Sequence, residues 1–193
     1  GLVDALRLGA FERVWNALHG GVGENGALQG LLRCLGLPFT GSDVLASAVG
    51  MDKLRSKQLF EAAGLRTPAW CLLRTLEDCR SAPARVGLPM AVKPNAEGSS
   101  VGVARVSTPD ELEAAWRAAS RYGGDVLAEQ WIEGDEFTAG VLQGEVLPLI
   151  RIEASSGFYD YQAKYFSDQT RYHCPCGLPA PREAALAAMA WRA

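Results

Sequence analysis

Short apolar runs alternate with helical patterns along most of the chain. Five runs of four to seven residues have the length of buried strands; they span 14–18, 67–73, 90–93, 101–106 and 126–132. The clearest helical pattern is amphipathic, and its apolar face consists of Leu112, Ala115, Trp116 and Ala119. Thr108, Pro109 and Glu111 supply the N-cap, N1 and N3 residues of that helix. Strands and helices together predict an α/β (α+β) fold.

Capping and turn residues predict the remaining elements. Helices are expected over 27–35, 42–49, 52–63 and 181–193. Gly36 and Gly64 are typical C′ residues for the first and third of these helices, and Ser42 is expected to cap the second. Gln143-Gly144 predicts a hairpin turn between the strands 137–142 and 146–152.

Composition and charge exclude several classes of protein. Of 193 residues, 48% are hydrophobic and 21% charged, as in ordinary globular proteins. The net charge of −3 does not indicate a surface that binds nucleic acid, and no apolar run approaches a membrane span of about 20 residues. The N-terminus lacks the pattern of a signal peptide. The five scattered cysteines therefore predict free thiols and a cytoplasmic location.

Both ends of the sequence predict a longer protein. The chain begins without Met in a helix-like stretch, and the helix over 181–193 has no closing Gly or Asn. The segment 153–178 is rich in Ser, Asp and Tyr and is predicted to be a long functional loop.

The stretch 91–103 carries the strongest chemical signal. An apolar strand delivers Lys93, a loop of small residues follows over 95–100, and a second strand begins at Val101. Small residues let the backbone approach a ligand, successive loop amides can point at an anion, and lysine adds a point charge. This pattern predicts a binding site for polyphosphate, although the chain contains no P-loop motif.

Two motifs suggest other chemistry on weaker grounds. Gly21, Gly23 and Gly26 match the dinucleotide fingerprint, but Asp43, the nearest acid about 20 residues on, belongs to a helix start. Amides at a helix N-terminus suit binding of a carboxylate or phosphate better. His173, Cys174 and Cys176 suggest a metal site, but three ligands so close together cannot form a closed zinc geometry, so an ordinary loop is the favoured interpretation.

A serine hydrolase is a remote alternative. The residues 98–102 match G-x-S-x-G with Ser100 as nucleophile, and Asp168 and His173 follow in hydrolase order. The nucleophile elbow requires a helix after the turn, whereas a β-branched strand pattern follows here. A hairpin loop is therefore favoured.

Other residues along the chain are candidates for the same predicted binding site. Lys53 lies in the first turn of a predicted helix, and Glu129 is a carboxylate within an apolar strand, where it needs a partner. The backbone over Gln130, Trp131 and Ile132 could bind a purine edge, with the last two side chains as walls. Glu136 could accept hydrogen bonds from ribose.

With these motifs in order, the chain resembles the D-alanine–D-alanine ligase family of the ATP-grasp superfamily. The resemblance runs through nearly the whole sequence and rests on 16–20, 23–26, 29–30, 36–42, 51–53, 93–94, 97–102, 129–132, 136–138, 158–161 and 163–165. It implies an ATP-grasp fold. The implied domains are the remainder of an N-terminal domain over 1–43, a central subdomain over 44–129 and the start of a C-terminal subdomain over 130–193.

The resemblance also implies roles for site residues. Lys53, Lys93 and Lys164 correspond to lysines that hold the phosphates of ATP. The phosphate loop corresponds to Glu97, Gly98, Ser99 and Ser100, and the adenine and ribose contacts to Glu129, Gln130, Trp131, Ile132 and Glu136. His19 corresponds to a histidine near the first D-alanine. Tyr165 and Ser99 correspond to a pair that locks a loop over the site.

The implied reaction uses ATP with Mg²⁺ or Mn²⁺ to phosphorylate one D-alanine, whose acyl phosphate is attacked by the amine of a second. The product would serve peptidoglycan synthesis, and a homodimer is implied. Asn25 stands where the family usually has Asp. The family's N-terminal glutamate, its magnesium ligands and an arginine have no counterpart here, so metal ligands are expected beyond Ala193. An inactive nucleotide-binding module of the same fold is therefore the alternative.

Overall fold

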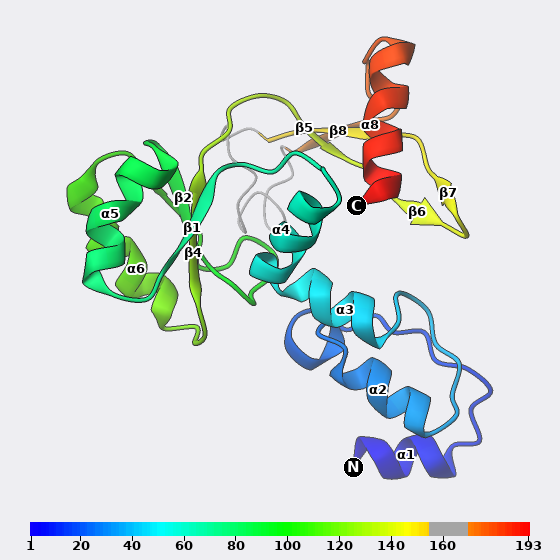
Figure 1. Ribbon diagram of the computed structural model, residues 1–193. Coiled ribbons are helices and arrows are strands. Elements are labelled where there is room, and N and C mark those ends of the chain that lie inside the picture. Colours follow the sequence, from blue (N-terminus) through cyan, green and yellow to red (C-terminus); the bar gives the residue numbers. More distant parts are fainter. Residues whose placement is uncertain (155–169) are drawn as a thin grey trace.

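A four-stranded sheet with the order β1-β4-β2-β3 lies at the centre of the chain. Its strands are antiparallel and comprise β1 (Trp70–Leu73), β2 (Met90–Pro94), β3 (Ala104–Val106) and β4 (Val126–Gln130). The computed structural model describes residues 1–154 and 170–193 and is shown in Figure 1. Four of the five strands predicted from apolar runs are thereby confirmed. β1 and β3 both begin later than predicted, at Trp70 rather than 67 and at Ala104 rather than 101, and residues 95–103 form the loop that joins β2 to β3.

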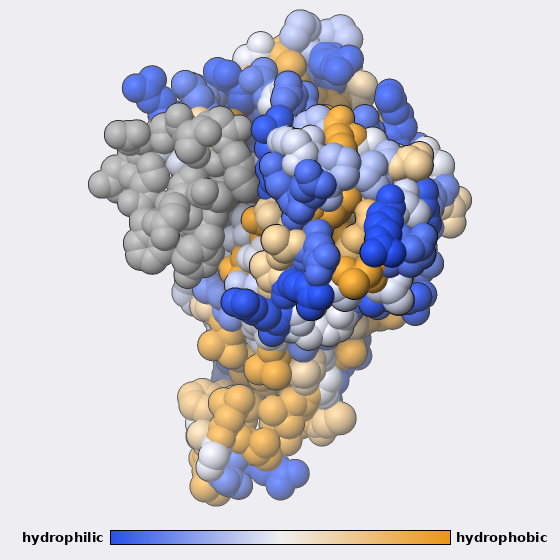
Figure 2. All heavy atoms as spheres, turned by 90° about the vertical axis from the view of Figure 1, so that its left-hand side faces the viewer, coloured by the Kyte–Doolittle hydropathy of each residue, from blue (hydrophilic) through white to orange (hydrophobic). Residues whose placement is uncertain are grey.

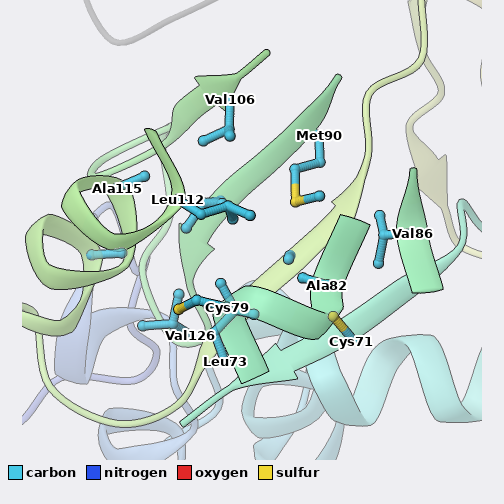
Figure 3. Packing of buried hydrophobic residues seen from close by; sticks show 13 residues of the cluster. Cys71, Leu73, Cys79, Ala82, Val86, Met90, Val106, Leu112, Ala115 and Val126 are labelled. Carbon is cyan, nitrogen blue, oxygen red and sulfur yellow. The ribbon is translucent and has the colours of Figure 1, made fainter. Parts of the chain in front are cut away.

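Two helices cover one face of this sheet and enclose the main core (Figure 3). They are α5 (Leu76–Val86) and α6 (Leu112–Ser120), the latter preceded by the 3₁₀ turn η2 (Pro109–Glu111). The face of α6 packs as predicted, since Leu112, Ala115 and Ala119 are buried. The hydroxyl of Thr108 makes no capping bond. The helix α5 escaped prediction because Pro83 lies inside it, although Thr75 and Asp78 form a capping box at its start.

The opposite face of the sheet carries polar residues. Side chains alternate between the two faces of a strand, so Val92 and Ala128 enter the core while Lys93 and Glu129 point to the other side. Arg105 is paired with Ala91 and belongs to this second face. A cation and a carboxylate from neighbouring strands thus share a face that α5 and α6 leave open.

The chain before the sheet is mostly helical. Its helices are α1 (Leu2–Leu8), η1 (Gly21–Gly23), α2 (Ala27–Cys34), α3 (Val44–Met51) and α4 (Lys53–Ala62). The predicted helices over 27–35 and 52–63 are confirmed, and Gly36 and Gly64 both follow with positive φ. Ser42 is not a cap. The carboxylate of Asp43 takes that role by accepting from the Val44 amide at 2.8 Å.

The predicted strand over 14–18 is wrong. Val14 makes an isolated parallel bridge with Phe39, and the Trp15 side chain is 82% exposed. An apolar run becomes a strand of a sheet only when neighbouring strands pair with it. Among the described residues, this run makes one isolated bridge. Hydrophobic residues gather over α1 to α3, at the lower end of the molecule in Figure 2.

A second group of strands follows β4. Its members are β5 (Glu136–Thr138), β6 (Val141–Leu142), β7 (Glu145–Val146), β8 (Ile150–Glu153) and β9 (Arg171–His173), followed by α8 (Ala180–Arg192). The hairpin of β6 and β7 turns at Gln143 and Gly144, as predicted. The loop predicted over 153–178 is wrong at its end, because β9 pairs with β8 there. Within 1–154 and 170–193, no helix combines the length and apolarity needed to cross a bilayer.

Candidate functional site

A cleft of about 830 Å³ lies over the open face of the sheet. Its floor contains Ala91, Lys93 and Glu129, and Arg105 lies to one side of them. The rest of the lining includes Ser100, Gln130, Trp131, Ile132 and Glu136. Residues from four strands, β2 to β5, and from the segment between β4 and β5 therefore line one cavity.

An ion cluster forms the floor of this cleft. One oxygen of Glu129 accepts from the Nζ of Lys93, and the other lies 2.8 Å from the Nζ of Lys57. Burial alone would raise the pKa of the Glu129 carboxyl, but the ammonium groups of Lys93 and Lys57 outweigh burial and hold that pKa below its usual range. Glu129 is thus an ionised carboxylate between two cations.

Lys53 lies beside this cluster and is fixed by the end of β2. Its Nζ donates to the backbone oxygens of Asn95, at 3.2 Å, and Glu97. The Asn95 side chain in turn accepts from the Leu54 amide at 2.8 Å and donates to Asp52 at 2.9 Å. Burial first, and then the charge of Lys93, lowers the pKa of Lys53 to about 8. Two crowded cations at this position define a site that favours an anion.

A second hollow of about 280 Å³ adjoins the first and shares Lys93 and Ser100 with it. Its lining also contains Lys53, Glu97 and Gly98. Ser99 and Ser100 have φ values of +53° and +60°. Two successive non-glycine residues in the left-handed region are uncommon, and such strain concentrates at ligand-binding loops.

The segment after β4 is held by backbone hydrogen bonds. The amides of Gln130 and Trp131 donate to the oxygens of Ala69 and Pro89, at 2.8 and 3.1 Å. Across the described ranges no acceptor is found for the amide of Ile132, whose side chain is 63% exposed. Of the three amides considered for a purine edge, the one that faces no partner is therefore that of Ile132.

The N-terminal glycine loop approaches the loop between β2 and β3. Glu24 accepts from the amide of Gly20 at 2.5 Å, and a Cβ on Gly98 would lie 3.8 Å from the same carboxylate oxygen. His19 precedes Gly20 and is exposed. It does not line either hollow. Lys164, Tyr165 and Asp168 lie outside the described residues.

Two competing interpretations are wrong. The residues 98–102 lead into β3, which pairs with β2 as a hairpin, so the nucleophile elbow on Ser100 is wrong. The dinucleotide fingerprint lacks a preceding strand, because 14–18 forms none. His173 binds Glu153 at 2.7 Å, and the residues that the structure describes contain no group of three His, Cys, Asp or Glu side chains able to hold a metal.

Sequence reasoning missed three residues of this site. Lys57 follows Lys53 by one helical turn, and that spacing predicts a shared helix face. Asn95 stands directly after the Lys93-Pro94 pair. Arg105 contacts the Trp131 ring, with its guanidinium carbon 5.4 Å from the ring centroid. Ala91 and Lys93 lie on the same face of their strand. The same alternation along the paired strand would have placed Arg105, the partner of Ala91, on that face.

The architecture is that of the ATP-grasp ligases, as the solved structures described below show. A family model described as D-ala D-ala ligase C-terminus matches residues 59–193. The chain therefore belongs to the D-alanine–D-alanine ligase family, which confirms the resemblance inferred from the motifs.

Related proteins agree with this placement. The chain is 54% identical over 192 residues to a D-alanine–D-alanine ligase of Methylococcus capsulatus, which covers all of this chain and 62% of that protein. The D-alanine–D-alanine ligase of Bacillus anthracis superposes with a TM-score of 0.82 at 33% identity, covering 99% of this chain and 63% of that one. VanG D-Ala:D-Ser ligase from Enterococcus faecalis gives the same TM-score and identity, with coverage of 94% and 55%. The chain thus spans less than two thirds of these relatives.

Proposed function

We propose that this chain carries the ATP site of a ligase that joins two D-alanines into D-alanyl-D-alanine. The observation that supports this most is the junction of the two hollows at Lys93, with Glu129 beneath it and Lys53 beside it. A nucleotide has an apolar base and an anionic tail. The larger hollow offers Trp131 and Ile132 as apolar surfaces within a largely polar lining, and the smaller one has cations and loop amides.

The lining suggests an orientation for ATP. The purine would lie against Trp131 and Ile132, with the Ile132 amide as a donor to its edge. Glu136 would accept from the ribose hydroxyls. The triphosphate would run past Lys93 towards Lys53 and the amides of Gly98, Ser99 and Ser100, where positive charge and backbone donors converge.

The proposed chemistry activates a carboxylate. Carboxylates are poor electrophiles, so transfer of the γ-phosphoryl group to one D-alanine supplies a leaving group for attack by the second amine. The acyl phosphate must be shielded from water. We assign His19 to the first D-alanine, Lys164 to the γ-phosphate, and Ser99 with Tyr165 to closure of the loop; these assignments rest on the family resemblance.

The proposed reaction also uses Mg²⁺ or Mn²⁺. In residues 1–154 and 170–193 the acidic and histidine side chains do not gather into a metal site, so these residues do not fit a two-metal centre. We propose that the Mg²⁺ or Mn²⁺ ligands of the whole enzyme lie beyond Ala193. A cytoplasmic homodimer that feeds peptidoglycan synthesis completes the proposal, in keeping with ATP as phosphate donor.

Product analysis tests the proposed activity. An enzyme extended at both ends should release phosphate and D-alanyl-D-alanine from ATP, Mg²⁺ and D-alanine, and it should release neither with L-alanine. Residues 1–193 alone, without the metal ligands, should release neither product from D-alanine. Because VanG is a D-Ala:D-Ser ligase, D-serine should be offered in competition with the second D-alanine. ATP binding without any dipeptide from an enzyme extended at both ends would favour the nucleotide-binding module instead.

A further inference from the structure

Lysine is rare in this chain, and the three lysines that the structure describes lie at or beside the cleft. Only four of its 19 basic residues are lysines, and the rest are arginines. Lys53 and Lys93 line the hollows already described. The remaining described lysine, Lys57, lines neither hollow, although it touches the same cluster. Arginine serves as the cation on the exposed surface, so the presence of lysine at 57 calls for a local explanation.

Lys57 is a fixed cation behind the cleft. Its side chain is 7% exposed, and its Nζ lies 2.6 Å from the hydroxyl of Thr67, 3.2 Å from the oxygen of Pro68 and 2.8 Å from Glu129. An ammonium has three N–H donors, so these contacts occupy all of them. A guanidinium is larger and planar, and its fixed fork cannot reproduce this compact three-way contact.

Lys93 is the exchangeable partner of the same carboxylate. It lines both hollows, is 18% exposed and contacts the Glu129 oxygen that Lys57 does not contact. Phosphates entering the smaller hollow compete with Glu129 for the Lys93 ammonium. If Lys93 turned to a phosphate and Glu129 had no other partner, a largely buried carboxylate would lose its counter-charge, which is strongly unfavourable.

We propose that Lys57 is a positioning residue that holds Glu129 ionised and in place, so that Lys93 can exchange Glu129 for the phosphates of a nucleotide. The inference rests on the proposed ATP site. It assigns Lys57 no contact with ATP and divides the cluster into a permanent pair, Lys57–Glu129, and a transferable cation, Lys93. Besides these two lysines, Lys53 acts on Glu129 from the start of α4, and Arg105 and Glu136 line the same cleft.

Calorimetry of ATP binding to the Lys57→Met protein tests this role. Methionine keeps an unbranched side chain of similar length but removes the ammonium. Arg55→Met is the matched control, because Arg55 lies on the exposed side of the same helix and bonds Gln58. We expect Lys57→Met to weaken ATP binding by about tenfold or more, as for loss of a charge-assisted contact, and Arg55→Met to leave it unchanged.

Proton counting separates positioning from a merely structural role. Without Lys57, Glu129 should take up a proton when Lys93 turns to the phosphates, so Lys57→Met should bind more protons with ATP between pH 5 and 7 than Arg55→Met does. The comparison cancels the titration of ATP itself. Buffers of different ionisation enthalpy measure that number.

The outcomes distinguish the two proposals. Unchanged affinity in Lys57→Met, or weaker binding with an unchanged proton count, would overturn the role of Lys57 and leave the ATP site intact. If the wild-type protein binds no ATP, both proposals fall. Should Lys57→Met not fold, Lys57→Gln, which retains a donor for Thr67 or Pro68, is read by the same two criteria.

Discussion

The Nζ of Lys53 donates to the backbone oxygen of Asn95 at 3.2 Å, which ties the first turn of α4 to the end of β2. The link is reinforced from the other side, because the Asn95 side chain accepts from the Leu54 amide. The cation from one element is thereby placed beside Lys93 from another. Each of these contacts has a measurable consequence.

ATP affinity should depend on the protonation of Lys53. Its pKa of about 8 means that the cation is half lost at that pH, and phosphates would restore it by favouring the charged form. Affinity should therefore fall as the pH rises from 7 to 9.5, with proton uptake on binding near pH 8. In Lys53→Arg the charge persists, so this pH dependence should disappear; a wild-type affinity that stays level across the range would contradict the assignment.

The same pKa shift affects stability in the opposite sense. The unfolded chain binds the Lys53 proton more tightly between about pH 8 and the ordinary value of 10.5, so the contribution of Lys53 to stability rises with pH through this window. Urea unfolding of wild type and Lys53→Met over that range should show the wild type gaining relative to the variant. If the wild type instead lost stability relative to Lys53→Met as the pH rises, the pKa of Lys53 would not be lowered in the folded protein.

Removal of the Asn95 side chain should destabilise the junction of α4 and β2. Asn95→Ala leaves the Leu54 amide, buried with its residue, without its acceptor and takes a donor from Asp52. We expect a loss of about 1–3 kcal/mol in the free energy of unfolding. Gln58→Ala on the exposed side of α4 should stay within about 0.5 kcal/mol. Equal stability of the two variants would show that the Asn95 contacts do not stabilise the junction of α4 and β2.

Gly102 should not tolerate a side chain. Its φ is +70°, and a Cβ would lie 2.6 Å from the Tyr122 ring and 2.8 Å from the ring of Pro94. Gly102→Ala should lower the free energy of unfolding by about 2 kcal/mol through strain and crowding. Gly30→Ala, in α2 with open space around it, should instead stabilise by up to about 1 kcal/mol. Thermal unfolding of both variants checks the contrast in sign.

Loss of the Glu129 charge should destabilise the protein, and the effect should fade in acid. Glu129→Gln leaves two lysines facing a neutral amide, which is expected to cost about 3–5 kcal/mol at pH 7. The lowered pKa of Glu129 means that its contribution is present above the ordinary value of 4.5 and is lost as the pH falls through the folded value. Denaturant titrations at pH 7 and pH 3 should show the gap closing; a gap independent of pH would be inconsistent with an ionised Glu129.

Apolar runs predicted the central sheet well because its strands are locally distinct, and the run over 126–132 has apolar residues on both faces. The predicted N-caps were a poorer guide, since Asp43 rather than Ser42 caps α3 and the hydroxyl of Thr108 makes no capping bond. The N-terminal run over 14–18 misled because burial depends on neighbours that local sequence does not reveal. The helix α5 was hidden by Pro83, which sequence rules treat as a breaker.

The candidate site was predicted by residue type and order, while its connections were not. Lys93, Glu129 and Glu136 do line one cleft. The pairing of Glu129 with Lys57 depends on where α4 lies relative to β4, which is a tertiary relationship without a local signal. Sequence alone likewise could not show that the amides of Gln130 and Trp131 are already bonded.

The nucleotide site in the cleft is tested most directly by a calorimetric titration of ATP into wild type and Lys93→Ala. Lys93 joins both hollows, so its removal should weaken ATP binding by at least about tenfold. Arg117→Ala is the control, since Arg117 is an exposed cation that pairs with Glu113 on α6, a helix on the other face of the sheet. We predict unchanged affinity for the control; equal ATP affinity in wild type and Lys93→Ala would contradict a nucleotide site in this cleft.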